Sequence, residues 1–336
     1  MKKLLNNPTN VVEEMIDGYL KAHPTYVRRL EENDRAVVTT RKTLDNKVGI
    51  LIGGGSGHEP GFLGYVGDGM ADGVAVGNIF ASPPPAPILE VTKAINKGAG
   101  VVYLYGNYAG DVMNFGMAAE LAEMEGIEVE MALTTDDVAS APKEEKEKRR
   151  GIAGEFFVFK TAGAAADKGY DLKNVARVAR KTNENTRSMG VGLTPCSLPQ
   201  TGKPSFEIGD DEMELGLGHH GEPGIKKAPL DTADNVADEL LDHIFADMPL
   251  NAGDDVAVLV NGLGSTPRME LYIMFRRVEQ RLKEKGINIY RSYVGDYITS
   301  LEMGGCSITL TKLDDELKTF IDHPVDCPMF TQVKED

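Results

Sequence analysis

The sequence predicts an α/β protein of two domains, each a mixed, largely parallel sheet flanked by helices. Two observations support this fold class. Short apolar runs alternate with helical stretches, and several of the runs end in glycine-rich turns, which is the rhythm of α/β domains. The chain also has 336 residues, 41% of them hydrophobic. At about 150 residues per domain, this is enough for two buried cores.

The first half is expected to begin with a helix, because apolar residues from Val11 to Leu20 recur on one helical face. Further helices are expected at 112–124 and from about 155 to 187. The mixed-sign run at 143–150, KEEKEKRR, is interpreted as a solvated loop or helix end. Buried strands are predicted at 48–52, 73–77, 101–105 and 129–133.

A change of character near 190–192 suggests a domain boundary. Prolines at Pro195 and Pro204 would break any helix there. We therefore predict an N-terminal domain at 1–188 and a C-terminal domain at 189–336. The second domain repeats the pattern, with strands expected at 213–217, 256–260, 287–294 and 307–311. Helices are expected at 232–247 and from the end of the loop at 261–267 to about 285.

Composition excludes several classes of protein. The formal net charge is −16, which argues against a nucleic-acid surface, since binding phosphate backbones needs clustered Lys and Arg. No stretch reaches the about 18 apolar residues of a membrane span. The three cysteines are far apart and form neither a disulfide framework nor a zinc site. The N-terminus lacks the apolar region of a signal peptide, so a reducing cytoplasm is expected.

Four glycine-rich loops follow predicted strands, at 53–60, 106–111, 218–224 and 261–267. Ligands of open α/β sheets bind beyond the carboxyl ends of the strands. Glycines there let the backbone come close to a small ligand. Polar residues on these loops are therefore the first candidates for function.

The loop at 53–58 does not bind a nucleotide in this interpretation. Its sequence, GGGSGH, has no glycine at the sixth place of GxGxxG and lacks the Lys-Ser/Thr ending of a P-loop. No set of protein-kinase motifs is present. We therefore expect no nucleotide or other cofactor in this chain, and the missing fingerprint also argues against an NAD-dependent dehydrogenase.

Three residues on separate strand-end loops, His58, Asp111 and His220, form the candidate site. A loop histidine is usually structural, but the coincidence of the three favours chemistry. Asp111 could cap a helix, act as a general base toward a hydroxyl, or do both. Adjacent side chains in an extended loop project in opposite directions, so His219 and His220 would not chelate one metal, and no metal site is expected. The remaining histidines lie on helical segments or at their ends, where a structural role is expected: His23, His243 and His323.

Five segments in order resemble the K subunit of dihydroxyacetone kinases, over nearly the whole chain. They are Gly53-Gly-Gly-Ser-Gly-His-Glu-Pro60, Asn107-Tyr-Ala-Gly-Asp-Val-Met-Asn-Phe115, Gly221-Glu-Pro-Gly224 after a histidine, Val260-Asn-Gly-Leu-Gly-Ser-Thr-Pro267 and Tyr297-Ile-Thr-Ser-Leu301. The resemblance implies that the chain is a subunit of a glycerone kinase, an enzyme that transfers a phosphoryl group to an alcohol. It implies as well that the chain forms a homodimer. It also implies a separate L subunit, which would carry ADP or ATP and Mg and belong to a phosphotransferase system.

The resemblance also implies roles for the candidate residues. His220 would attack the ketose carbonyl and hold the substrate as a covalent hemiaminal, with Asp111 and His58 as the acid–base pair. Residues Gly55, Ser56 and Gly57 would line the pocket, together with Gly106, His58, Asp111 and His220. A neutral imidazole can act as a nucleophile, and this bond would select a ketone over glycerol.

Two positions depart from the family pattern and leave alternatives open. Gly106 stands where dihydroxyacetone-specific members have a lysine, and His219 stands where an apolar residue is usual. A smaller residue at 106 could admit a longer ketose such as erythrulose. A protein of another class, a dihydroxyacetone-sensing coactivator without kinase activity, is the second alternative. The presence of both Asp111 and His220 favours catalysis over sensing.

Overall fold

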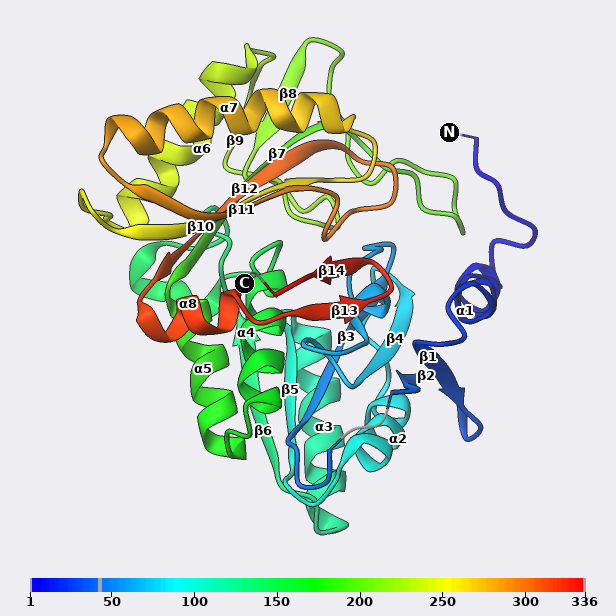
Figure 1. The fold of residues 1–336 in the computed structure, drawn as a ribbon. Coiled ribbons are helices and arrows are strands. Elements are labelled where there is room, and N and C mark those ends of the chain that lie inside the picture. The colour runs from blue at the N-terminus through cyan, green and yellow to red at the C-terminus, as the bar shows by residue number, and fades with distance from the viewer. Residues whose placement is uncertain (1, 42–43, 335–336) are drawn as a thin grey trace. The chain divides into compact units, whose positions relative to one another are not determined.

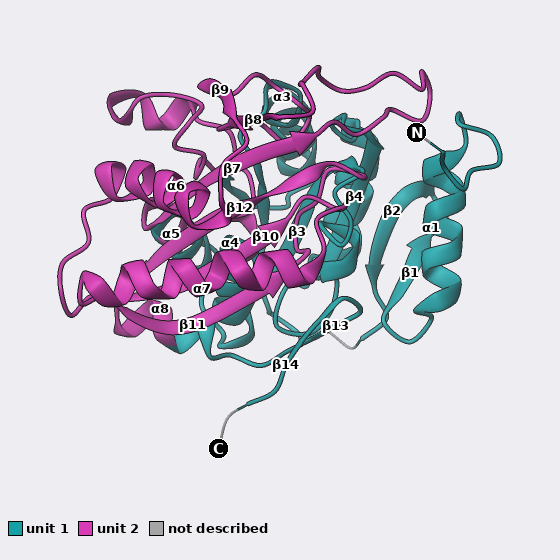
Figure 2. Cartoon of the chain, turned by 90° about the horizontal axis from the view of Figure 1, so that it is seen from above, with its two compact units in different colours: residues 1–133, 157–181, 319–336 teal, residues 134–156, 182–318 magenta. Residues whose placement is uncertain are grey.

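The computed structural model describes residues 2–41 and 44–334 (Figure 1). The chain divides into two compact units, coloured separately in Figure 2. Unit 1 comprises residues 1–133, 157–181 and 319–336, and unit 2 comprises 134–156 and 182–318. This division differs from the single predicted boundary at 188/189. That boundary falls inside strand β7 (Thr186–Thr194), which pairs with β12 (Gly304–Leu313) in the sheet of unit 2.

Unit 1 is built on a six-stranded sheet with the order β1-β2-β4-β3-β5-β6. Its strands are β1 (Val27–Leu30), β2 (Asn33–Thr39), β3 (Gly49–Ser56), β4 (Gly73–Ile79), β5 (Val101–Gly106) and β6 (Val129–Thr134). Strand β3 is parallel to β4 and β5, whereas β1 and β2 add an antiparallel edge. The apolar runs predicted β3, β4, β5 and the edge strand β6, whereas β1 and β2 at the other edge of the sheet were missed.

Helices of unit 1 occur at the predicted positions near 11–20 and 112–124, the helix at 85–95 was not predicted, and the predicted helix over 155–187 needs a correction. The helices are α1 (Val11–Ala22), α2 (Pro85–Ile95), α3 (Ala109–Met124), α4 (Glu155–Asp167), α5 (Leu172–Glu184) and the short 3₁₀ helix η1 (Leu63–Tyr65). The single helix predicted over 155–187 was wrong. Gly169, with φ +79°, ends α4, as glycine commonly does after a helix. Asp171 then accepts a hydrogen bond from the Asn174 amide at the start of α5.

The core of unit 1 joins α2 and α3 to the sheet. It includes Leu51, Val91, Tyr103 and Phe115. The C-terminal residues of the chain return to this unit as a two-stranded pair, β13 (Val325–Cys327) and β14 (Phe330–Gln332).

Unit 2 contains a second six-stranded sheet with the order β11-β10-β12-β7-β8-β9. The strands not yet given are β8 (Glu212–Leu215), β9 (Lys226–Pro229), β10 (Asp255–Gly262) and β11 (Asn288–Gly295). Two helices, α6 (Ala233–Asp247) and α7 (Arg268–Glu284), pack against each other and the sheet. Two short helices complete the fold, η2 (Lys143–Lys148) and α8 (Asp315–Ile321).

The predicted class, two mixed sheets flanked by helices, is confirmed. The second sheet is less parallel than expected, because β10 and β11 form a parallel pair while the pairs β10–β12, β12–β7, β7–β8 and β8–β9 are antiparallel. None of the helices within the described residues is long and apolar enough to cross a membrane.

Candidate active site

His58 and Asp111 follow neighbouring strands of unit 1. Strand β3 leads to His58 and the adjacent parallel strand β5 leads to Asp111. The chain continues from β3 to β4 on one side, and from β5 to β6 on the other. The chain therefore adds its next strand on opposite sides of the sheet after β3 and after β5, although the two strands are parallel. In α/β sheets such a switch point is the usual place for a ligand.

The glycines after Ile52 serve close packing more than turning. Strand β3 continues through Gly53 to Ser56, which corrects the expected turn at 53. A Cβ on Gly53 would lie 2.6 Å from the Ala75 carbonyl oxygen. The chain turns at Gly57, whose φ is +98°, a conformation that suits glycine.

His58 packs against aromatic rings and is only 4% exposed. Its ring stacks on Phe80 at a centroid distance of 5.1 Å and meets the edge of Phe62 at 6.1 Å. Beside it, the Glu59 carboxylate accepts the Gly57 amide at 3.0 Å, and burial raises the Glu59 pKa. Ser56 is also buried and donates its hydroxyl to the Gly77 carbonyl. These contacts fix the backbone that carries Gly55, Ser56, Gly57 and His58.

Asp111 lies in the first turn of α3 and is 8% exposed. The N-cap residue of α3 is Tyr108, so Asp111 is not the helix cap that was one of its two predicted roles. Acidic groups are favoured at this end of a helix by the macrodipole. Burial and the negative charge of Asp111 raise the pKa of Tyr105 to about 12. Gly106, the last residue of β5, is buried next to this turn.

His219 and His220 lie in unit 2, in the loop that joins the antiparallel strands β8 and β9. His219 is 6% exposed, and its carbonyl oxygen accepts a hydrogen bond from the hydroxyl of buried Ser300. The His220 side chain is 24% exposed. The two neighbouring histidines therefore differ in burial, and only His220 presents substantial surface.

Glu222 holds His220 in place and was missed by the sequence analysis. One carboxylate oxygen of Glu222 lies 3.0 Å from His220 Nδ1, and the other accepts the His220 backbone amide at 2.9 Å. Arg150 Nη1 lies 3.7 Å from the same carboxylate. Burial acts to raise the pKa of Glu222, but His220 and Arg150 hold it well below its ordinary value. Its place in GEPG, two residues after the candidate nucleophile, was the available signal.

The charge run at 143–150 was only partly interpreted correctly. Its first six residues, 143–148, are exposed, whereas Arg149 is 1% exposed. Arg149 forms a two-pronged ion pair with Asp247, with Nη2 2.6 Å from the carboxylate, and Arg187 contacts the same group. Arg150 pairs with buried Asp137 at 2.8 Å. The last two residues of the run are therefore part of the interior of unit 2.

The loop after β10 has a bracing role. Buried Asn261 accepts the amides of Tyr297 and Ile298 and donates to the Ile298 carbonyl at 2.7 Å. This fixes the segment that carries Ser300 and so supports the loop of His219. Two of the motifs singled out in the sequence thus act together within unit 2.

The other histidines have the structural surroundings expected of them. His23 ends α1 and contacts the Tyr19 ring at 4.7 Å. His243 is exposed on α6, and His323 Nε2 lies 3.2 Å from Asp167. Within residues 2–41 and 44–334, no group of three or more His, Cys, Asp or Glu residues could hold a metal ion.

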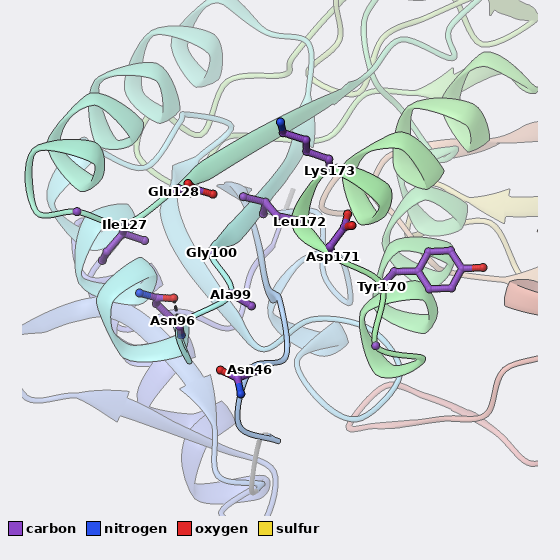
Figure 3. A pocket seen from close by; sticks show the side chains of 13 residues that line it. Asn46, Asn96, Ala99, Gly100, Ile127, Glu128, Tyr170, Asp171, Leu172 and Lys173 are labelled. Carbon is purple, nitrogen blue, oxygen red and sulfur yellow. Dashed lines mark hydrogen bonds between the residues drawn. The ribbon is translucent and has the colours of Figure 1, made fainter.

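The pocket in Figure 3 has a volume of about 630 Å³. It lies at the amino-terminal ends of the unit 1 strands, whereas His58 and Asp111 follow their carboxyl ends. It is formed by the turns that precede β3, β5 and β6 and by the start of α5, including Asn46, Gly100, Glu128 and Lys173. None of the predicted site residues lines the pocket.

Comparison with known proteins places these residues in a family context. The Dak1 domain model matches residues 17–329. A protein of Listeria innocua serovar 6a, the dihydroxyacetone-binding subunit DhaK of PTS-dependent dihydroxyacetone kinase 2, is 51% identical over 98% of this chain and 99% of its own length. The L-erythrulose kinase of Pectobacterium atrosepticum is 42% identical over 98% of this chain, which spans 56% of that protein.

Solved structures agree with the fold. The dihydroxyacetone kinase of C. freundii, in complex with AMP-PNP and Mg²⁺, has a TM-score of 0.90 and 33% identity, covering 100% of this chain and 62% of that one. The dihydroxyacetone kinase operon co-activator Dha-DhaQ has a TM-score of 0.87 and 33% identity, covering 94% of this chain and 97% of that one.

Proposed function

Because this chain belongs to the Dak1 domain family, we propose that it is the ketose-binding subunit of a dihydroxyacetone kinase. The observation that carries the proposal is the match along 99% of a dihydroxyacetone-binding subunit. The buried positions of His58 and Asp111 at a switch point of the unit 1 sheet support it. The reaction is phosphoryl transfer to a terminal hydroxyl of the ketose.

In this proposal His220 holds the substrate. The lone pair of Nε2 attacks the ketone carbon, the carbonyl π electrons move to oxygen, and that oxygen takes up a proton to complete the hemiaminal. A three-carbon ketose has few atoms for non-covalent affinity, at about 1.5 kcal/mol per atom at best. The covalent bond adds affinity and excludes glycerol, which has no carbonyl.

Asp111 then acts as general base toward the terminal hydroxyl, and His58 supports the proton transfer. Residues Gly55, Ser56, Gly57 and Gly106 bring the backbone close to the substrate. Phosphoryl transfer depends mainly on positioning and charge stabilisation, and a nucleotide with Mg²⁺ on a partner L subunit would supply the phosphoryl group. The family resemblance also leads us to propose a cytoplasmic homodimer.

Calorimetric titration tests substrate binding. The purified chain should bind dihydroxyacetone and not glycerol, and His220→Ala should abolish measurable binding. Adding an ADP-loaded or ATP-loaded partner subunit should then yield phosphorylated ketose. Failure of wild-type protein to bind dihydroxyacetone or erythrulose would overturn the proposed substrate class.

Erythrulose is the second candidate substrate, and Gly106 is the observation that favours it. A buried glycine ends β5 where dihydroxyacetone-specific members have a lysine, and a relative named L-erythrulose kinase is 42% identical. Comparing phosphorylation of the two ketoses with the same partner decides between them. A clear preference for dihydroxyacetone would reject the four-carbon substrate.

The similarity to a co-activator raises a non-catalytic alternative. A sensor needs the histidine that captures the carbonyl but has no need of a general base. Asp111→Asn distinguishes the two functions, because it should abolish phosphorylation while leaving ketose binding measurable. Absence of phosphorylation by wild-type protein with any loaded partner would favour the sensor.

A further inference from the structure

We infer that Glu222 is a positioning residue that fixes the reactive tautomer of His220, with the proton on Nδ1 and the nucleophilic lone pair on Nε2. This inference rests on the proposed role of His220 as the nucleophile. It adds a residue to the machinery of unit 2, and it gives Arg150 a role in support of that residue.

The tautomer follows from hydrogen-bond chemistry. An ionised carboxylate only accepts hydrogen bonds, and Glu222 Oε1 lies 3.0 Å from His220 Nδ1. In a neutral imidazole one nitrogen carries the proton and the other has the lone pair. Holding the proton on Nδ1 therefore leaves Nε2 as the nucleophile.

The backbone makes this contact a fixed one. The second oxygen of Glu222 accepts the amide of His220 itself at 2.9 Å, and the Gly218 amide donates to the Glu222 carbonyl at 3.0 Å. Gly221, at φ +82°, allows the chain to turn between the two residues. The ring and its carboxylate partner are thus held by one short loop.

Arg150 extends the arrangement into the interior. Its guanidinium lies 3.7 Å from Glu222 Oε2 and is held by Asp137 at 2.8 Å and by the Gly216 carbonyl at 3.2 Å. Asp137 is 1% exposed, so the ion pair between Asp137 and Arg150 is shielded from water. Arg150 favours the ionised form of Glu222, the form that accepts the Nδ1 proton.

The same carboxylate stabilises the adduct more than the free ring. When Nε2 bonds to the ketone carbon, the oxygen takes a proton from solvent and the imidazole becomes a cation that keeps its Nδ1 proton. In the free ring only the acceptor of this hydrogen bond is charged, whereas in the adduct a cationic ring faces the carboxylate and the two opposite charges attract. The contact between Nδ1 and Glu222 therefore strengthens as the covalent bond forms, which favours the bound state.

Nitrogen-15 NMR of the imidazole rings tests the tautomer directly. In wild-type protein without substrate, the His220 signals, assigned by their loss in His220→Ala, should show a protonated Nδ1 and an unprotonated Nε2. In Glu222→Gln the population should shift toward the other tautomer. A wild-type ring protonated on Nε2, or a variant with an unchanged tautomer, would overturn the inference.

Dihydroxyacetone affinity gives a second readout. At metal sites, loss of a group that orients a ligating histidine typically costs about 10–100-fold in metal affinity, and we expect the same range in ketose affinity for Glu222→Gln. Arg150→Lys should weaken binding less, because charge is kept while the fork geometry is lost. Glu212→Gln is the matched control, since exposed Glu212 on β8 accepts only the Gly209 amide among the contacts described, and it should bind within about twofold of wild type.

The two readouts separate the possible failures. If wild-type protein binds no ketose but its tautomer shifts in Glu222→Gln, the positioning role stands and the proposed function fails. If wild-type protein binds the ketose and Glu222→Gln binds equally well with the same tautomer, the proposed function stands and the role of Glu222 is rejected.

Discussion

Asp247, the last residue of α6, is the acceptor for two arginines in unit 2, and replacing it tests how unit 2 is held together. The Arg149, Arg187 and Asp247 side chains are 1%, 9% and 8% exposed. Asp247→Asn keeps the size of the side chain and removes the negative charge between two guanidinium groups. Breaking a buried pair on one side costs about 3–5 kcal/mol, and we expect a loss of this size in the free energy of unfolding.

The same helix offers a matched control. Asp242 also pairs with an arginine, Arg281, but its side chain is 65% exposed. Exposed pairs contribute at most about 1 kcal/mol, so Asp242→Asn should change the stability little. Urea unfolding of wild type and both variants measures the difference. Equal losses in Asp247→Asn and Asp242→Asn would refute the argument from burial.

The effect should depend on pH in a defined direction. Burial acts to raise the pKa of Asp247, but the hydrogen bonds and charges of Arg149 and Arg187 hold it below its ordinary value. A carboxyl with a lowered folded pKa stabilises the protein above its unfolded pKa, about 3.9, and loses this contribution as pH falls through the folded pKa. The stability gap between wild type and Asp247→Asn should therefore be constant near pH 7 and shrink below about pH 4. A gap that stays constant through the acid range would contradict this explanation.

Three further substitutions probe the loop of His220, the brace made by Asn261 and a pair of buried salt bridges in unit 1. Gly218→Ala should weaken ketose binding in calorimetry by about tenfold, because its Cβ would displace the side chains of Glu222 and Arg150; unchanged affinity would argue against this close approach. Asn261→Ala should cost about 3 kcal/mol in urea unfolding, since it leaves buried loop amides without their acceptor, and a loss below about 1 kcal/mol would reject the brace. Burial acts to lower the pKa of Lys47, but Asp72 and Asp167 raise it overall. Lys47→Met should therefore lose about 3 kcal/mol in the free energy of unfolding below pH 10 and approach wild type as pH rises through the folded pKa of Lys47. A loss independent of pH would count against these ion pairs.

The parts of the fold that were predicted are those with strong local patterns. Buried apolar runs such as Val101–Tyr105 and Val256–Val260 were found because a strand buried on both faces is continuously hydrophobic. The edge strand Val27–Leu30, with sequence VRRL, was missed because exposed edges carry polar residues. The path of the chain between the units was also missed, since strand Thr186–Thr194 gives no local sign of the sheet it joins.

The residues of the candidate site were also predicted from a local pattern. His58, Asp111 and His220 were chosen for their positions on glycine-rich loops, and the structure places the first two after adjacent strands of unit 1. Glu222 and Arg150 were missed because their importance comes from tertiary contacts. Arg150 is 72 residues from Glu222 in sequence, at the end of a run of charges that resembles a solvated surface.

NMR of dihydroxyacetone labelled with carbon-13 at the carbonyl tests the central claim most directly, because it follows the atom that His220 is proposed to attack. With wild-type protein, the bound carbon should move from the ketone region of the spectrum to the region of tetrahedral carbons bonded to both nitrogen and oxygen, and this signal should be absent with His220→Ala. A bound ligand whose carbonyl carbon keeps its ketone shift in the wild-type protein would contradict covalent capture.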